Sequence, residues 1–252
     1  MLVLKLTLVP ICLALLSLAA RAWGPRVAGW LAGLPMVAGP ILFFLALENG
    51  VAFGAQAASA ALGAAFGTVW YCLGYAWTAT RYAWPVAVSV GIAAWAASIV
   101  LMSFFDGSLA AGVIACVAAL LAAPPLFPRR SAAAGRALPR YEIVFRMVAG
   151  AAVVLIVTGV AAAIGPVWSG LVSAFPTLGT VLAVFSHRAN GGAYTASLLR
   201  AMCFGMGSLV AFFAALALLL PTLGIALGFV VTVAICLSVQ WIAGGVMRRA
   251  GA

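Results

Sequence analysis

A stretch of twelve residues that is rich in glycine and proline occurs twice in this chain. Gly24–Pro35 returns without a gap as Gly165–Pro176, 141 residues further along the sequence. The same offset pairs Asn49 with Asn190 and Gly50 with Gly191. Most of the identical positions are glycine or proline, the residue types that set backbone geometry. The pattern therefore predicts that one backbone shape has been duplicated.

The shortage of charge decides which solvent surrounds that shape. Only 6% of the residues are charged and 67% are apolar, whereas an ordinary globular domain carries roughly 25% charged residues. So few charges cannot build a water-facing surface, and the composition predicts a membrane protein with the lipid bilayer as its partner. In lipid, every backbone polar group needs an internal partner, which restricts spans to helices or closed barrels. Because the apolar runs lack period-two alternation, we expect an all-α, polytopic transmembrane bundle.

Nine segments satisfy the rule that a helix needs about 20 apolar residues to cross a bilayer. They cover residues 3–20, 27–47, 52–79, 84–104, 108–127, 142–163, 167–186, 193–219 and 222–246. The first segment also fits a cleaved signal peptide. However, its Lys5 and Ser17 align with Arg146 and Thr158 at the repeat offset, so we interpret it as a helix.

Nine helices divide into two units of four with one helix left over. The predicted organisation is a first four-helix repeat at 1–105, a connector helix and basic loop at 106–140, and a second four-helix repeat at 141–252. Since an odd number of spans precedes the second repeat, it enters the membrane in the opposite direction. This arrangement is the inverted-topology repeat of many secondary transporters.

The basic residues predict the orientation of the bundle. If nine helices alternate in direction, all thirteen lysines and arginines except Lys5 lie on or near one side, and the positive-inside rule makes that side cytoplasmic. The N-terminus is then periplasmic and the C-terminus cytoplasmic. The same asymmetry accounts for the net charge of +10, so we expect no nucleic-acid partner.

Two of the predicted helices are interrupted at matching places, by Pro35 and Pro176. A proline removes one intrahelical hydrogen bond, and in a membrane such a break persists where other helices or a cavity satisfy the freed groups. One interpretation is a substrate site where the two broken helices meet near the midplane. The other is that the kinks merely shape the bundle.

The helices that follow these breaks, 52–79 and 193–219, combine small residues with a few polar ones. Small residues allow close helix packing, and polar side chains should face the protein interior. The candidate substrate-binding residues are therefore Pro35, Gln56, Ser59, Pro176, Thr177, Ser197 and Arg200. Arg200 has two interpretations: it lies about 10 Å deep and attracts an anion, or it snorkels to the interface.

The sequence offers little for catalysis or metal binding. Its three acidic residues, Glu48, Asp106 and Glu142, lie apart at helix ends or in turns, and its five cysteines show no paired spacing. We expect no enzymatic activity, no metal site and no cofactor. His187, the single histidine, is interpreted as part of an interfacial turn, with a pH-sensitive gate as the alternative.

The run VWSGLVSAFPT, Val167–Thr177, resembles the centre of the GlpM type of bacterial inner-membrane protein. The likeness extends loosely to Ser208 and, less clearly, over Ala28–Pro35, where Leu34 and Met36 depart from the pattern. The resemblance implies a bacterial inner-membrane location and an ancestral unit of half this length. It carries no mechanism.

These observations lead to two hypotheses from different classes. The first is an inner-membrane transporter or flippase-like protein that moves a small amphipathic or anionic substrate, either a small molecule or a lipid-linked one, between the two repeats. The alternative is a non-transporting scaffold subunit of an envelope-synthesis complex. Substrate identity, coupling ion and homo-oligomerisation are left open by the sequence.

Overall fold

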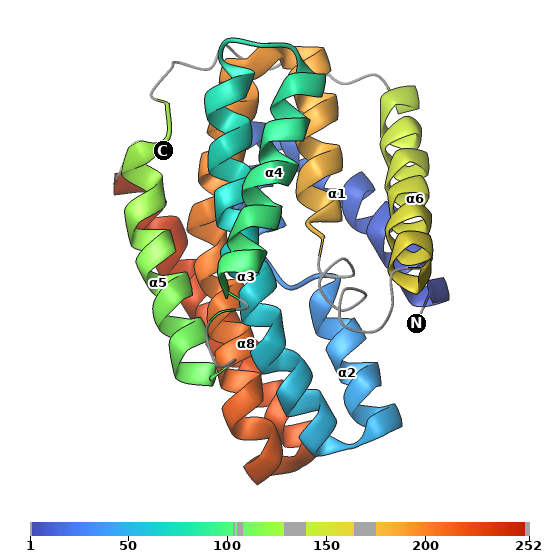
Figure 1. Ribbon diagram of the computed structural model, residues 1–252, viewed down its shortest axis with the longest axis vertical. Helices are drawn as coiled ribbons and strands as arrows, with labels where there is room; N and C mark the ends of the chain where they lie inside the picture. The colour runs from blue at the N-terminus through green and yellow to red at the C-terminus, as the bar shows by residue number, and fades with distance from the viewer. Residues whose placement is uncertain (1, 103, 105–107, 129–139, 164–174, 250–252) are drawn as a thin grey trace.

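The computed structural model describes residues 2–102, 104, 108–128, 140–163 and 175–249, and every element within these ranges is a helix (Figure 1). The elements are α1 (Leu2–Ala32), α2 (Ala38–Asn49), α3 (Val51–Ala79), α4 (Trp84–Met102), α5 (Leu109–Leu126), α6 (Arg140–Ala163) and α8 (Thr177–Arg249). Five of them, α1, α3, α4, α5 and α8, are long and apolar enough to cross a membrane. The prediction of an all-α protein is confirmed for this part of the chain, and its long apolar helices are compatible with a lipid bilayer.

The prediction of nine separate helices is wrong, because the described residues form seven. The difference arises at glycines inside α1 and α8. Gly24 has φ 84° and ψ 178°, while Gly191 and Gly224 have φ 81° and 72° with ψ near 180°. Such dihedrals are open essentially to glycine alone. They redirect the chain within one residue, so helical hydrogen bonding resumes at once where the sequence predicted loops between segments.

These breaks are physically necessary in α8. Its 73 residues would extend about 110 Å as a straight helix, at 1.5 Å per residue. The chain instead leaves helical geometry at Gly191 and again at Gly224, and the orange-to-red ribbon of α8 reverses direction at the upper and lower ends of the molecule in Figure 1. The beginning of the span predicted at 167–186 lies outside the described residues.

Gly50, which separates α2 from α3, adopts nearly the same conformation as Gly191, with φ 90° and ψ 168°. The two glycines are partners at the repeat offset. The turn between α2 and α3 lies at the lower end of the molecule in Figure 1, where α3 begins. Gly192, next to Gly191, lies instead against the carbonyl of Ala79, where α3 ends. The repeated Asn-Gly pair therefore makes the same backbone turn at opposite ends of the bundle.

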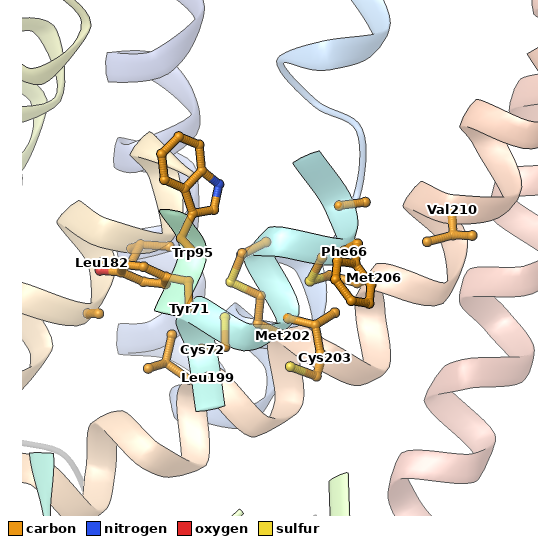
Figure 2. Close-up of a cluster of buried hydrophobic side chains, with 14 of the residues drawn as sticks. Phe66, Tyr71, Cys72, Trp95, Leu182, Leu199, Met202, Cys203, Met206 and Val210 are labelled. Atoms are coloured by element: carbon orange, nitrogen blue, oxygen red, sulfur yellow. The ribbon is translucent and has the colours of Figure 1, made fainter. Parts of the chain in front are cut away.

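The core lies where α3 packs against α8, with α1 packed on the other side of α8. Figure 2 shows side chains of α3 (Phe66, Tyr71 and Cys72) beside side chains of α8 (Leu199, Met202 and Cys203). The contact between α1 and α8 is close because it is made by glycines. A Cβ atom added at Gly205 would lie 2.1 Å from the carbonyl oxygen of Trp30, so only glycine permits this approach.

Among the residues that the structure describes, one charged side chain is buried. Arg146 of α6 is fully buried; its Nη2 donates to Glu142 Oε1 at 2.8 Å, and its Nη1 lies 3.5 Å from Ser17 Oγ of α1. The guanidinium also lies 5.6 Å from the ring centroid of Phe185 on α8. Because a buried charge is tolerated only when it is paired and hydrogen-bonded, these contacts fix α6 against α1 and α8.

Replacing Gly205 by alanine should destabilise the protein, because the new methyl group would collide with the Trp30 carbonyl. Overpacking of this kind costs about 1–3 kcal/mol. The matched control is Gly63→Ala on α3, where an added Cβ meets nothing within 4 Å. The control should be neutral or stabilising by up to about 1 kcal/mol. Thermal unfolding in detergent compares the two variants, and equal midpoints would contradict the close contact between α1 and α8.

Glu142→Gln should destabilise the protein more than Arg146→Met does. Removing one partner of a buried ion pair costs about 3–5 kcal/mol, and less is expected here because the Glu142 side chain is 17% exposed. Methionine instead replaces the buried charge with an apolar chain, an exchange that is often neutral, and leaves a carboxylate that water can reach. The opposite order of unfolding midpoints would show that Arg146 is not held by Glu142.

Candidate substrate cavity between two proline turns

A cavity of about 260 Å³ lies where the break between α1 and α2 meets the beginning of α8. Side chains from α1, α2, α3, α6 and α8 surround it, and nearly all of them are apolar. The lining residues are Val9, Ala32, Leu34, Pro35, Val37, Ala38, Ile41, Ala61, Ala64, Ala65, Thr68, Val154, Val157, Phe175, Pro176, Thr177, Leu178, Gly179, Met202, Leu209 and Phe213. None of these residues carries an ionisable side chain.

The two prolines that the sequence singled out are the centres of matching turns in the wall of this cavity. The amide of Met36 donates to the carbonyl of Leu34 at 2.8 Å, and the amide of Thr177 donates to the carbonyl of Phe175, also at 2.8 Å. Each hydrogen bond spans one proline and closes a three-residue turn. The carbonyl groups of Pro35 and Pro176 then accept from the amides of Gly39 and Thr180, at 2.8 and 2.9 Å. The duplicated sequence therefore produces the same backbone geometry twice.

Each turn leads directly into a helix whose N-terminus faces the cavity. Val37 and Ala38 line the cavity at the start of α2, and Thr177, Leu178 and Gly179 line it at the start of α8. The first amide groups of a helix lack intrahelical acceptors. Here Gly39 and Thr180 donate to the proline carbonyls and Thr177 donates to the carbonyl of Phe175. Because Pro40 has no N–H, the remaining N–H groups at the two helix starts belong to Ala38, Leu178 and Gly179. In Figure 1 α2 leads away toward the lower end, whereas the first part of α8, from Thr177 to the break at Gly191, leads toward the upper end. Two positive helix ends thus meet at mid-height.

The hydroxyl groups of the cavity satisfy local backbone carbonyls. Thr68 Oγ1 donates to the carbonyl of Ala64 at 2.8 Å, and Thr177 Oγ1 lies 3.4 Å from the carbonyl of Phe175. One wall is aromatic: the Phe175 ring lies 5.5 Å from the ring centroid of Trp95 and 6.5 Å from that of Tyr71. The cavity therefore offers an apolar interior with two helix ends as its polar features.

The structure brings together three of the predicted site residues and leaves four elsewhere. Pro35, Pro176 and Thr177 line the cavity. Four do not: Gln56 is exposed, Ser59 and Ser197 are half-buried, and the guanidinium of Arg200 lies 6.0 Å from the ring centroid of Phe204. The span that contains Arg200 begins immediately after Gly191.

The sequence did not predict the aromatic and thioether part of the lining, such as Phe175, Met202 and Phe213. Phe175 directly precedes Pro176, so its position beside the break gave a usable signal. Met202 and Phe213 belong to a long apolar run, in which no local signal separates a residue facing the cavity from one facing lipid. His187 was expected in a turn, but it lies half-buried within the first part of α8.

The described lining residues offer groups for binding: they include no acidic, basic or thiol side chain, and the two helix starts among them favour an anionic group. Within the described residues, no group of three or more His, Cys, Asp or Glu side chains is arranged to hold a metal ion.

Comparisons with protein-family models, with curated proteins and with solved structures give no match for this chain.

Proposed function

We propose that this protein is a membrane carrier for a small amphipathic anion and that the anion passes through the cavity between Pro35 and Pro176. The observation that carries the proposal is the pair of matching proline turns, each of which points a helix N-terminus into one apolar cavity. Interrupted helices with their positive ends at a central site are how secondary transporters bind anionic groups. The apolar lining accommodates the rest of the substrate.

The proposal includes an inverted repeat of two four-helix units with a connector. It is supported by Gly50 and Gly191, which share a conformation and lie at opposite ends of the molecule. In this arrangement the N-terminus is periplasmic and the C-terminus cytoplasmic, in accordance with the positive-inside rule. A bacterial inner-membrane location rests on the resemblance to the GlpM type and stays a prediction.

The strength of the helix-end interaction indicates which substrates are suitable. Each helix N-terminus stabilises a nearby anion by about 0.3–1 kcal/mol, and by about 2 kcal/mol in a partly buried site. Even millimolar affinity requires about 4 kcal/mol. An inorganic anion held by the helix ends alone would therefore bind poorly. We expect a substrate whose apolar body fills the cavity while its charged group lies between the helix ends.

Benzenesulfonate is a suitable probe, because it combines a permanent negative charge with a compact apolar ring. The purified protein, reconstituted in phosphatidylcholine vesicles loaded with unlabelled benzenesulfonate, should exchange it for labelled benzenesulfonate outside. Benzylammonium, a cation of similar shape, should not exchange. Ala64→Phe, which places a ring in the cavity, should abolish exchange. The matched control is Ala60→Phe, one turn earlier on α3, where the side chain is exposed and outside the cavity.

Equal exchange by Ala64→Phe and Ala60→Phe would contradict a path through this cavity. Absence of exchange by the folded wild-type protein would contradict the carrier proposal for this class of anion. The scaffold hypothesis predicts no exchange by the folded wild-type protein, together with co-purification of partner proteins after mild detergent extraction.

A further inference from the structure

A second cavity, of about 410 Å³, lies between the beginning of α6 and the first part of α8. Tyr141, Phe145 and Arg188 in its wall are exposed, so a ligand can reach this cavity from outside the protein. Its wall combines a carboxylate, a guanidinium and three aromatic rings, unlike the apolar wall between Pro35 and Pro176. The lining residues are Tyr141, Glu142, Phe145, Phe185, Arg188 and Ala189.

This second cavity lies at one end of the bundle. The guanidinium of Arg188 lies 6.0 Å from the ring centroid of Trp84, the first residue of α4. Both α4 and α6 begin at the upper end of the molecule in Figure 1. Tryptophan and tyrosine are enriched at the level of the lipid headgroups, and arginine extends its charge to the same level. The position of the cavity therefore suits a headgroup.

The α6 side of the cavity suits a cation. The rings of Tyr141 and Phe145 are one helical turn apart, with centroids separated by 6.3 Å, and the faces of such rings attract an ammonium group. The neighbouring carboxylate of Glu142 accepts from Arg146 through Oε1 at 2.8 Å, and a carboxylate can accept several hydrogen bonds. Arg146 is buried and is not among the lining residues. The wall on this side thus presents a carboxylate and two rings.

The α8 side of the cavity suits an anion. Arg188 is exposed, and its guanidinium lies over the Trp84 ring. A guanidinium binds phosphate through two parallel N–H···O hydrogen bonds. One cavity therefore offers a site for a phosphate and a site for an ammonium group, which are the two charges of a zwitterionic phospholipid headgroup.

An exposed apolar face of α6 begins at this cavity. It is formed by Tyr141, Phe145, Val148, Ala152 and Leu155, whose spacings of three and four residues place them on one side of the helix. In Figure 1 α6 runs from the upper end toward the lower end of the molecule. Acyl chains attached to a headgroup in the cavity would lie along this face, whereas a soluble phosphate ester would leave it unused.

We propose that this cavity binds the headgroup of a zwitterionic phospholipid, with the phosphate at Arg188 and the ammonium group beside Glu142, Tyr141 and Phe145. The acyl chains lie along the exposed face of α6. The inference goes beyond the carrier function and does not depend on it, because the two cavities share no lining residue.

The test compares two lipids with identical acyl chains. Phosphatidylethanolamine carries both charges, and phosphatidylglycerol carries the phosphate alone. In native mass spectrometry, the purified and delipidated protein should bind phosphatidylethanolamine more tightly. Arg188→Gln should weaken binding of both lipids about tenfold, because it removes a charge-assisted hydrogen bond. Phe145→Leu should weaken binding of phosphatidylethanolamine about threefold and leave phosphatidylglycerol unchanged, because the ring attracts the ammonium group.

Both changes have matched controls at exposed positions outside the cavity. Arg81→Gln removes an arginine that lies 5.4 Å from the Trp77 ring centroid, and Phe53→Leu removes an exposed ring of α3. Both controls should bind the two lipids as the wild-type protein does.

Three results would overturn the proposal: no lipid bound by the wild-type protein, tighter binding of phosphatidylglycerol, or equal losses in Arg188→Gln and Arg81→Gln. Glycerophosphoethanolamine, the soluble headgroup, should compete only weakly with the lipid. Binding as tight as that of phosphatidylethanolamine would overturn the lipid assignment and indicate a soluble ligand.

Discussion

Backbone polar groups within an apolar bundle need hydrogen-bond partners inside the protein. The rest of this structure depends on how the segments around Pro35 and Pro176 satisfy these groups. Pro35 and Pro176 each lie at the centre of the same three-residue turn, and each proline carbonyl accepts from an amide in the first turn of the helix that follows. The starts of these two helices line one cavity, and a helix N-terminus favours negative charge. The described residues of the cavity wall include no basic side chain, so this preference comes from the backbone.

The two proline segments share a backbone geometry but not the side chains around them. They make the same hydrogen bonds, and Gly50 and Gly191, which are partners at the repeat offset, have nearly the same dihedral angles. The side chains nearby differ: Tyr71 and Tyr75 of α3 correspond at this offset to Phe212 and Leu216. The repeated sequence therefore accounts for the turns and not for the side chains beside them.

Composition and the internal repeat were sufficient to predict the helical class and the position of the proline turns. The low charge content predicted apolar helices. The 141-residue offset drew attention to Pro35 and Pro176, and the structure places both of them, with Thr177, in the wall of one cavity. Helix boundaries failed at Gly24, Gly191 and Gly224, because one glycine redirects the chain where a loop was expected. Polarity suggested four residues that do not line the cavity: Gln56, Ser59, Ser197 and Arg200. A residue lines the cavity when its face of the helix is turned toward it, and polarity alone does not predict that face. The burial of Arg146 and the contact of His187 with Tyr75 join residues 129 and 112 positions apart, and no local pattern encodes such pairs.

The central claim is that one unit was duplicated and inverted, so that its two broken helices present their N-termini to each other from opposite sides. Single cysteines at Asn49 and Asn190 test it most directly, because the five native cysteines are buried. In sealed vesicles of uniform orientation, a membrane-impermeant thiol reagent should label one of these positions from outside and the other only after permeabilisation. Labelling of both positions from the same side would contradict the inverted arrangement and the account of the site built on it.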